Sequence, residues 1–174
     1  MGSIERVVEQ AGRAGRVPGE SLRLLRDLLN SGGKGAELVR DTFMRQYDNL
    51  LDALRYDRVN EARIAIHSLL NAGSMLHDEL PEILARIYGI LLAVKGTPRG
   101  EFHMQLAQIS DSLVSTYCAL DHGLEKSKWR VRDLALQTGL SDEEVGLIDL
   151  SFRLAQSFVR TVACGLSSAL PLIS

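Results

Sequence analysis

The segment KSKWRVR, residues 126 to 132, gathers the residue types that contact nucleic acids. Its four cations are Lys126, Lys128, Arg130 and Arg132, and they surround Trp129, the single tryptophan of the chain. An indole ring can stack on an unpaired base while neighbouring cations meet phosphates. These five residues are therefore a candidate nucleic-acid contact. The alternative is a solvated helix face with the tryptophan tucked into the core, because charged runs are usually exposed to water.

Other arrangements that do chemistry are missing from the sequence. A carboxylate-bridged di-metal bundle needs a histidine three residues after a glutamate, whereas Glu101 and His103 are two apart and point apart on a helix. The glycine-rich segment SGGKG at 31–35 lacks the spacing of a phosphate-binding loop, and we interpret it as a flexible link. The sequence also lacks a GxSxG motif and a cysteine with an evident histidine partner. We therefore expect no enzyme activity, and no catalytic, cofactor-binding or metal-binding residues.

The stretch LALQTGLSDEEVG, residues 134 to 146, has the residue types of a helix-turn-helix corner. Ala135, Gly139 and Val145 have the spacing that lets two helices pack closely around a turn, and we expect Gly139 to have a positive φ. Ser141, followed by glutamate three residues later, is a capping box that starts the next helix. The acidic residues at 142–144 would oppose DNA but favour a helix N-terminus, so we predict a structural corner.

The segment from Ser141 to about Ser168 has two apolar stripes, where a surface helix needs only one. The second stripe is a candidate partner or dimer interface, made of Leu147, Leu150, Leu154 and Phe158. Either another chain covers it, most simply in a homodimer, or helices of the same chain wrap it. We favour the homodimer.

Glycine, proline and short polar runs divide the rest of the chain into helical blocks. They occur at 12–20, 30–35, 56–60, 78–81, 95–100 and 138–141, and apolar residues between them recur at steps of three and four. Pro81 stands where a helix would begin, ahead of an apolar segment that we expect at the centre of the fold. We predict an all-α, single-domain compact bundle of six to eight helices spanning residues 1–174. Residues 1–35 are a candidate peripheral or mobile N-terminal helical segment.

The composition is that of an ordinary folded domain. Of 174 residues, 45% are apolar and 24% are charged, with a net charge of −2, so a self-sufficient core is expected. Cys118 and Cys164 have apolar helical surroundings, and we interpret them as small core residues in a reducing compartment. Charges begin at Glu5, and no apolar run is long enough to span a membrane. These features favour a cytoplasmic protein without membrane contact.

Together the patterns favour a non-catalytic helical protein–protein interaction module, such as an adaptor, a structural subunit or a chaperone-like protein. We expect its partner to be another protein or, in a self-associating homo-oligomer, a second copy. The alternative is a nucleic-acid-binding protein, either RNA-binding or accessory to transcription, that uses the basic segment around Trp129. The small negative net charge gives this alternative no support.

Overall fold

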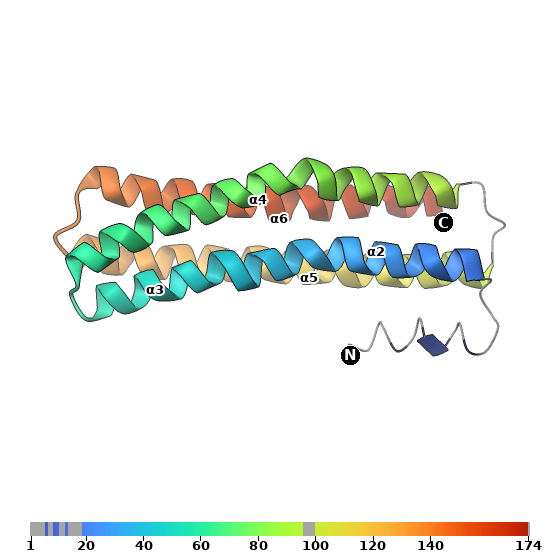
Figure 1. Ribbon diagram of the computed structural model, residues 1–174, viewed down its shortest axis with the longest axis horizontal. Helices are drawn as coiled ribbons and strands as arrows, with labels where there is room; N and C mark the ends of the chain where they lie inside the picture. Colours follow the sequence, from blue (N-terminus) through green and yellow to red (C-terminus); the bar gives the residue numbers. More distant parts are fainter. Residues whose placement is uncertain (1–5, 7–8, 11–12, 14–18, 96–99, 174) are drawn as a thin grey trace.

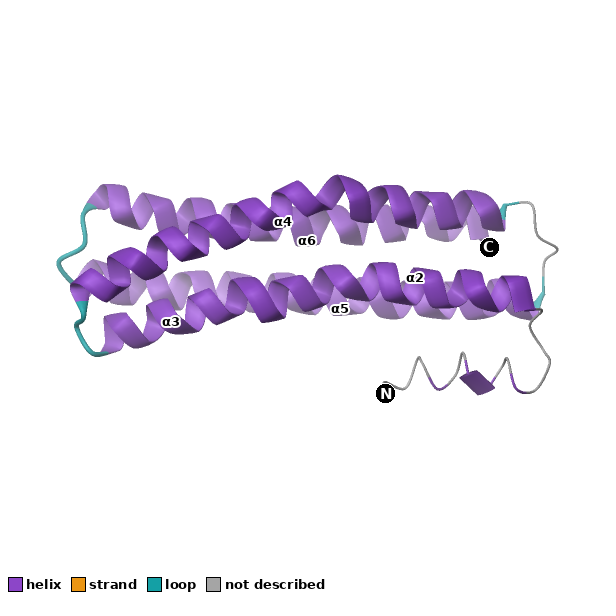
Figure 2. Ribbon diagram, viewed as in Figure 1, coloured by secondary structure: helices purple, strands orange, loops and turns teal. Residues whose placement is uncertain are grey.

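The computed structural model describes residues 6, 9–10, 13, 19–95 and 100–173, with side chains as far as residue 168. Within these residues the chain is helical, without strands, and four long rods lie side by side (Figures 1 and 2). The first rod joins α2 (Gly19–Leu38), the π-turn η1 (Val39–Phe43) and α3 (Met44–Arg55) without a break. The others are α4 (Val59–Val94), α5 (Glu101–Gln137) and α6 (Asp142–Ile173). None of the described helices has the length and apolarity needed to cross a membrane.

The rods form two antiparallel hairpins that stack on each other. The first rod pairs with α4 and α5 pairs with α6, while stacking places the first rod against α5 and α4 against α6 (Figure 1). Stacked helices run in the same direction: along α4 and α6, Arg63 contacts Glu144 and Gly73 lies against Leu154. Consecutive helices α4 and α5 therefore lie diagonally opposite each other.

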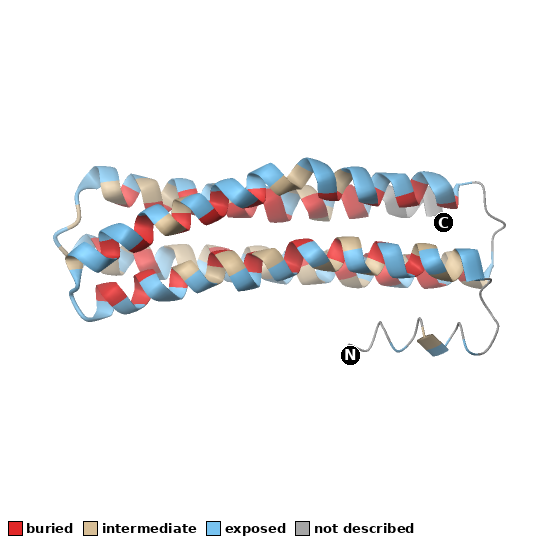
Figure 3. Cartoon of the chain, in the orientation of Figure 1, coloured by how far each residue is buried: buried red, intermediate tan, exposed pale blue. Residues whose placement is uncertain are grey.

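The core is one apolar layer between the two hairpins, buried along the length of the rods (Figure 3). Within it the ring of Phe152 is roughly perpendicular to those of Phe43 and Tyr47, with ring centroids 5.1 and 6.0 Å apart. Buried positions on the first rod recur at steps of three and four, which in a helix keeps them on one face. This spacing is why the sequence forms long amphipathic helices.

Two glycines bring α2 close to α5. A Cβ built on Gly32 would lie 2.6 Å from Leu113, and one built on Gly35 would overlap the hydroxyl of Tyr117. Tyr117 is fully buried and donates a hydrogen bond to the carbonyl of Gly32. The prediction of a flexible link at 31–35 is therefore wrong. The glycines lie inside a helix, where close packing offsets their poor helix propensity.

The main correction to the predicted fold is that the described residues form four rods rather than six to eight helices. The predicted break at 30–35 lies within α2, and the predicted helix start at Pro81 lies inside α4. Proline removes the hydrogen bond to the carbonyl of His77, but both residues are exposed, so water can satisfy that carbonyl. The apolar end of α4 lies at one end of the bundle rather than at its centre (Figure 1); Ile87, Leu91 and Val94 are buried there, whereas Tyr88 and Leu92 are exposed.

The turn predicted at 138–141 is present, but it is not a helix-turn-helix corner. The backbone N–H of Ser141 donates to Glu144 at 3.1 Å and the N–H of Glu144 donates to Ser141 Oγ at 3.2 Å, which confirms the capping box. Ala135 and Val145 are buried, as that pattern requires. However, α5 and α6 fold back antiparallel along their whole length (Figure 1), and Gly139 does not have a positive φ. The corner is an αα-hairpin.

Two further predictions concern the cysteines and the N-terminal segment. Cys118 and Cys164 are exposed, so the prediction that they are core residues is wrong. Residues 19–35 belong to α2, which packs on α4 and α5. Of residues 1–18, only residues 6, 9–10 and 13 are described, and the rest of the predicted N-terminal segment lies outside the described residues.

Gly35→Ala should lower the free energy of unfolding by about 1–3 kcal/mol, because the new methyl group meets the immobile Tyr117 hydroxyl and the ring of Phe158. Gly33→Ala is the matched control in the same helix turn, since its Cβ would meet nothing within 4 Å. The control should stabilise the chain by up to about 1 kcal/mol through helix propensity. Urea denaturation measures both changes, and equal effects would show that the close approach at Gly35 is misplaced.

Candidate functional site

The predicted basic segment lies on α5, but its four cations divide between two sides of the helix. Lys126 and Arg130, four residues apart, are exposed on the outer side. Lys128 and Arg132, also four apart, face α6 and are partly buried. Trp129 lies between the two pairs and is 50% exposed. The five residues of the candidate nucleic-acid contact therefore do not form one continuous basic surface.

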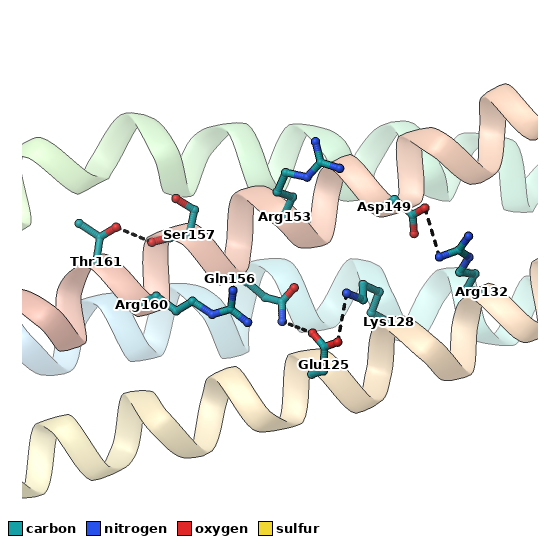
Figure 4. A pocket seen from close by; sticks show the side chains of 9 residues that line it. All are labelled: Glu125, Lys128, Arg132, Asp149, Arg153, Gln156, Ser157, Arg160 and Thr161. Atoms are coloured by element: carbon teal, nitrogen blue, oxygen red, sulfur yellow. Dashed lines mark hydrogen bonds and ion pairs between the residues drawn. The ribbon is translucent and has the colours of Figure 1, made fainter.

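Lys128 and Arg132 line a hollow between α5 and α6 of about 630 Å³, which we name the polar groove (Figure 4). Arg153 and Arg160 of α6 contribute two more cations to it, and neither was predicted as a site residue. The full lining is Glu125, Lys128, Arg132, Asp149, Arg153, Gln156, Ser157, Arg160 and Thr161. Periodicity could have found Arg153 and Arg160, because they lie two helical turns apart on one side of α6.

Glu125 is the centre of the polar groove. Its carboxylate accepts hydrogen bonds from the Gln156 side-chain amide at 2.6 Å and from the Trp129 indole N–H at 2.9 Å, and the Lys128 ammonium lies 3.2 Å away. These donors, the Gln156 amide first, lower the pKa of Glu125 from 4.5 to about 2. The network joins α5 to α6 and leaves this carboxylate fully satisfied.

The remaining cations of the polar groove differ in how far they are paired. Arg132 lies 3.7 Å from Asp149, too long for a hydrogen bond, while Nε of Arg160 donates to both oxygens of Asp121 at 3.0 and 3.1 Å. Arg153 makes no ion pair or hydrogen bond within the described residues. It is the one cation of this groove without an ion pair within the described residues, although Asp149 lies one turn away on α6.

Trp129 already has cations of its own chain against its ring. The Lys128 ammonium lies 5.2 Å and the Arg132 guanidinium 5.4 Å from the ring centroid. A base that stacked on the indole would have to displace these cation–π contacts. The same two cations are also turned toward carboxylates of the polar groove.

The second stripe of α6 is largely covered by its own chain. Phe158 is 1% exposed and lies beside Gly35 of α2, and Leu154 packs over Gly73 of α4. Leu147 is partly buried against the core, and Leu150 is 39% exposed. Of the four residues in the candidate interface, only Leu150 presents much of its side chain to solvent. The homodimer itself stays a prediction.

A second hollow, of about 500 Å³, follows the seam between α5 and the first rod at the π-turn. We name it the apolar groove. It is lined by Val39, Arg40, Met44, Ser115, Thr116, Ala119, Leu120, Gly123, Leu124 and Ser127. Sequence reasoning missed this site, although four small residues of α5 recur in it at steps of four, at 115, 119, 123 and 127.

The π-turn lies at the edge of the apolar groove. The Met44 N–H donates to the carbonyl of Val39, five residues back, which widens the helix by one residue. Val39, Phe43 and Tyr47, within and just after this turn, are all buried in the core. Such π-turns occur often at functional sites.

Within the described residues, no three His, Cys, Asp or Glu side chains gather where they could hold a metal ion. Comparison with known proteins adds no family: no protein-family model, curated protein or solved structure matches this chain.

Glu125→Gln should destabilise the chain most at neutral pH. A carboxyl whose pKa is lower in the folded than in the unfolded chain stabilises the fold above the unfolded pKa, and this contribution is lost as the pH falls through the folded value. The difference in unfolding free energy between parent and variant should therefore shrink between pH 4.5 and about 2. Urea denaturation across this range measures it. Glu37→Gln, at an exposed position, is the control, and a difference independent of pH would contradict the network.

Phe158→Glu and Leu150→Glu separate the buried part of the second stripe from its exposed part. The first variant places an unpaired carboxylate in the core and should unfold the chain, because such burial costs several kcal/mol. The second should keep the helical circular dichroism and the cooperative melting of the parent. A folded monomeric Phe158→Glu chain would instead place Phe158 at an intermolecular seam.

Proposed function

We propose that the protein is a non-catalytic helical interaction module whose apolar groove binds a helix of a partner protein. The observation that carries this proposal is an open, mostly apolar hollow on the outside of an already complete four-helix core. Apolar grooves between helices commonly receive amphipathic helices. The pairing of charges in the polar groove supports the proposal further, because it leaves that surface less suited to a large polyanion.

The small residues of α5 make room for another backbone. A Cβ built on Gly123 would meet nothing within 4 Å, and Ala119 is exposed beside it. Rows of residues four apart form the ridges and grooves by which helices pack, and short side chains in such a row allow a close approach. A helix lying along 115–127 would contact α5 on one side and Met44 on the other.

Arg40 indicates which charged group the partner helix carries. It is the only ionisable residue of the groove lining, and no carboxylate pairs with it among the described residues. A guanidinium at the border of an apolar surface pairs well with a carboxylate, which accepts two of its N–H groups. The occupant is therefore an amphipathic helix with an apolar stripe and an aspartate or glutamate that reaches Arg40.

Nucleic-acid binding is the less supported function. Lys126 and Arg130 are exposed and available, but Lys128 and Arg132 face away from them into the polar groove. Nucleic-acid affinity grows with the number of phosphates neutralised together, so a divided set of cations is a weak electrostatic footprint. The proposed helix-binding role does not depend on these residues.

A displayed library of helical peptides, randomised on one face, tests the proposal without a known partner. Selection on the parent protein should enrich apolar stripes that carry one carboxylate. Binding should be lost in Ala119→Trp, which fills the groove, and weakened by about tenfold or more in Arg40→Glu, which repels the carboxylate. Leu150→Trp, on an exposed apolar position of α6, is the matched control and should bind like the parent.

Two outcomes would change the proposed place of the contact or the proposed occupant of the groove. Enriched peptides that bind Ala119→Trp as well as the parent would place the contact outside the apolar groove. A parent that is dimeric by light scattering, and that Ala119→Trp converts to a folded monomer, would identify the occupant as a second copy of this chain.

A further inference from the structure

The polar groove keeps hydrogen-bond donors that its own network does not use. A guanidinium carries five N–H groups. Arg160 donates only its Nε–H to Asp121, so its four terminal N–H groups remain available. Arg153 makes no ion pair or hydrogen bond within the described residues. The exposed hydroxyl of Ser157 lies between them along α6, one turn from each. These three side chains form a short row of free donors.

The free donors lie on α6. Of the two carboxylates that line the groove, Glu125 is on α5, whereas Asp149 is on α6, one turn before Arg153, and its Oδ1 has no hydrogen-bond partner within the described residues. Glu125 accepts from Gln156 and Trp129, and Asp149 faces Arg132. Figure 4 shows Arg160 extending along the groove toward Gln156, whereas Arg153 and Ser157 lie above it on α6 and extend away from Arg160. The α6 row is therefore the positively charged part of a hollow whose other charges are largely balanced.

We propose that Arg153, Ser157 and Arg160 bind a phosphate group. A tetrahedral oxyanion has several acceptor oxygens, and it suits two guanidinium groups and a hydroxyl better than a planar carboxylate does. The exposed side chain of Arg153 is unpaired, so it can rotate over the groove at little cost. The site is separate from the apolar groove, which lies between α5 and the first rod.

The row fits one phosphate rather than a long polyanion. Arg153 and Arg160 are seven residues apart, about 10 Å along the helix, and the next cations toward α5 are held by carboxylates. Lys126 and Arg130 do not line this groove. The phosphate therefore belongs to a small molecule or to a phosphorylated side chain of a protein.

Calorimetric titration with inorganic phosphate, at fixed ionic strength and against a chloride blank, tests the site. The parent should bind, and Arg153→Gln should bind about tenfold more weakly, because a charge-assisted hydrogen-bonding partner is lost. Arg130→Gln, which removes an exposed arginine on the outer side of α5, is the matched control and should bind like the parent. Circular dichroism checks that each variant is folded.

Arg160→Lys keeps a charge beside Asp121 but removes the spare terminal N–H groups of the guanidinium. It should therefore weaken phosphate binding without loss of fold.

Titration with a phosphoserine peptide distinguishes the two sources of the phosphate. If the phosphate belongs to a partner protein, the peptide should bind more tightly than inorganic phosphate. No heat above the chloride blank, or equal binding by the parent and Arg153→Gln, would overturn the proposal. Tighter binding of a single-stranded oligonucleotide that depends on Lys126 and Arg130 would overturn it in favour of a polyanion surface. Ala119→Trp should bind phosphate like the parent, so failure here leaves the helix-binding proposal intact.

Discussion

The contact between Tyr117 and the two glycines of α2 fixes how the hairpins stack. Burial raises the pKa of Tyr117 well above its ordinary value, so its hydroxyl stays protonated and donates to the carbonyl of Gly32. A side chain larger than hydrogen at Gly35 would overlap the Tyr117 hydroxyl, and one at Gly32 would displace the end of the Leu113 side chain. This contact draws the first rod onto α5, and Phe158 of α6 packs at the same point.

Two different surfaces result from this stacking. Beyond the close contact, the π-turn at 39–43 and the small residues of α5 leave the apolar groove between the same two rods. On the other side of α5, charged residues replace apolar ones, and Glu125 joins α5 to α6 through Gln156, Trp129 and Lys128. One helix therefore borders the apolar groove on one side and the polar groove on the other.

The sequence predicts the helices better than their ends, because apolar periodicity is local whereas the effect of a breaker depends on its neighbours. The all-helical fold and the capped turn at Ser141 follow from local patterns and are confirmed. Taken by themselves, Gly35 and Pro81 indicate helix ends. In the structure Gly35 allows a close contact between α2 and α5, and Pro81 lies on an exposed face of α4. Lys128 was part of the predicted site, but Arg153 became its neighbour only through the pairing of α5 with α6, which no local pattern reveals.

A double-mutant cycle on Gly35→Ala and Tyr117→Phe, measured by urea denaturation, tests the stacking contact directly. The two changes should be strongly coupled, because phenylalanine lacks the hydroxyl that the new methyl group would meet. Gly35→Ala should then cost less in the Tyr117→Phe background than in the parent, by at least about 0.5 kcal/mol. Additive effects of the two changes would contradict the account, because they would mean that Gly35 and the Tyr117 hydroxyl do not meet.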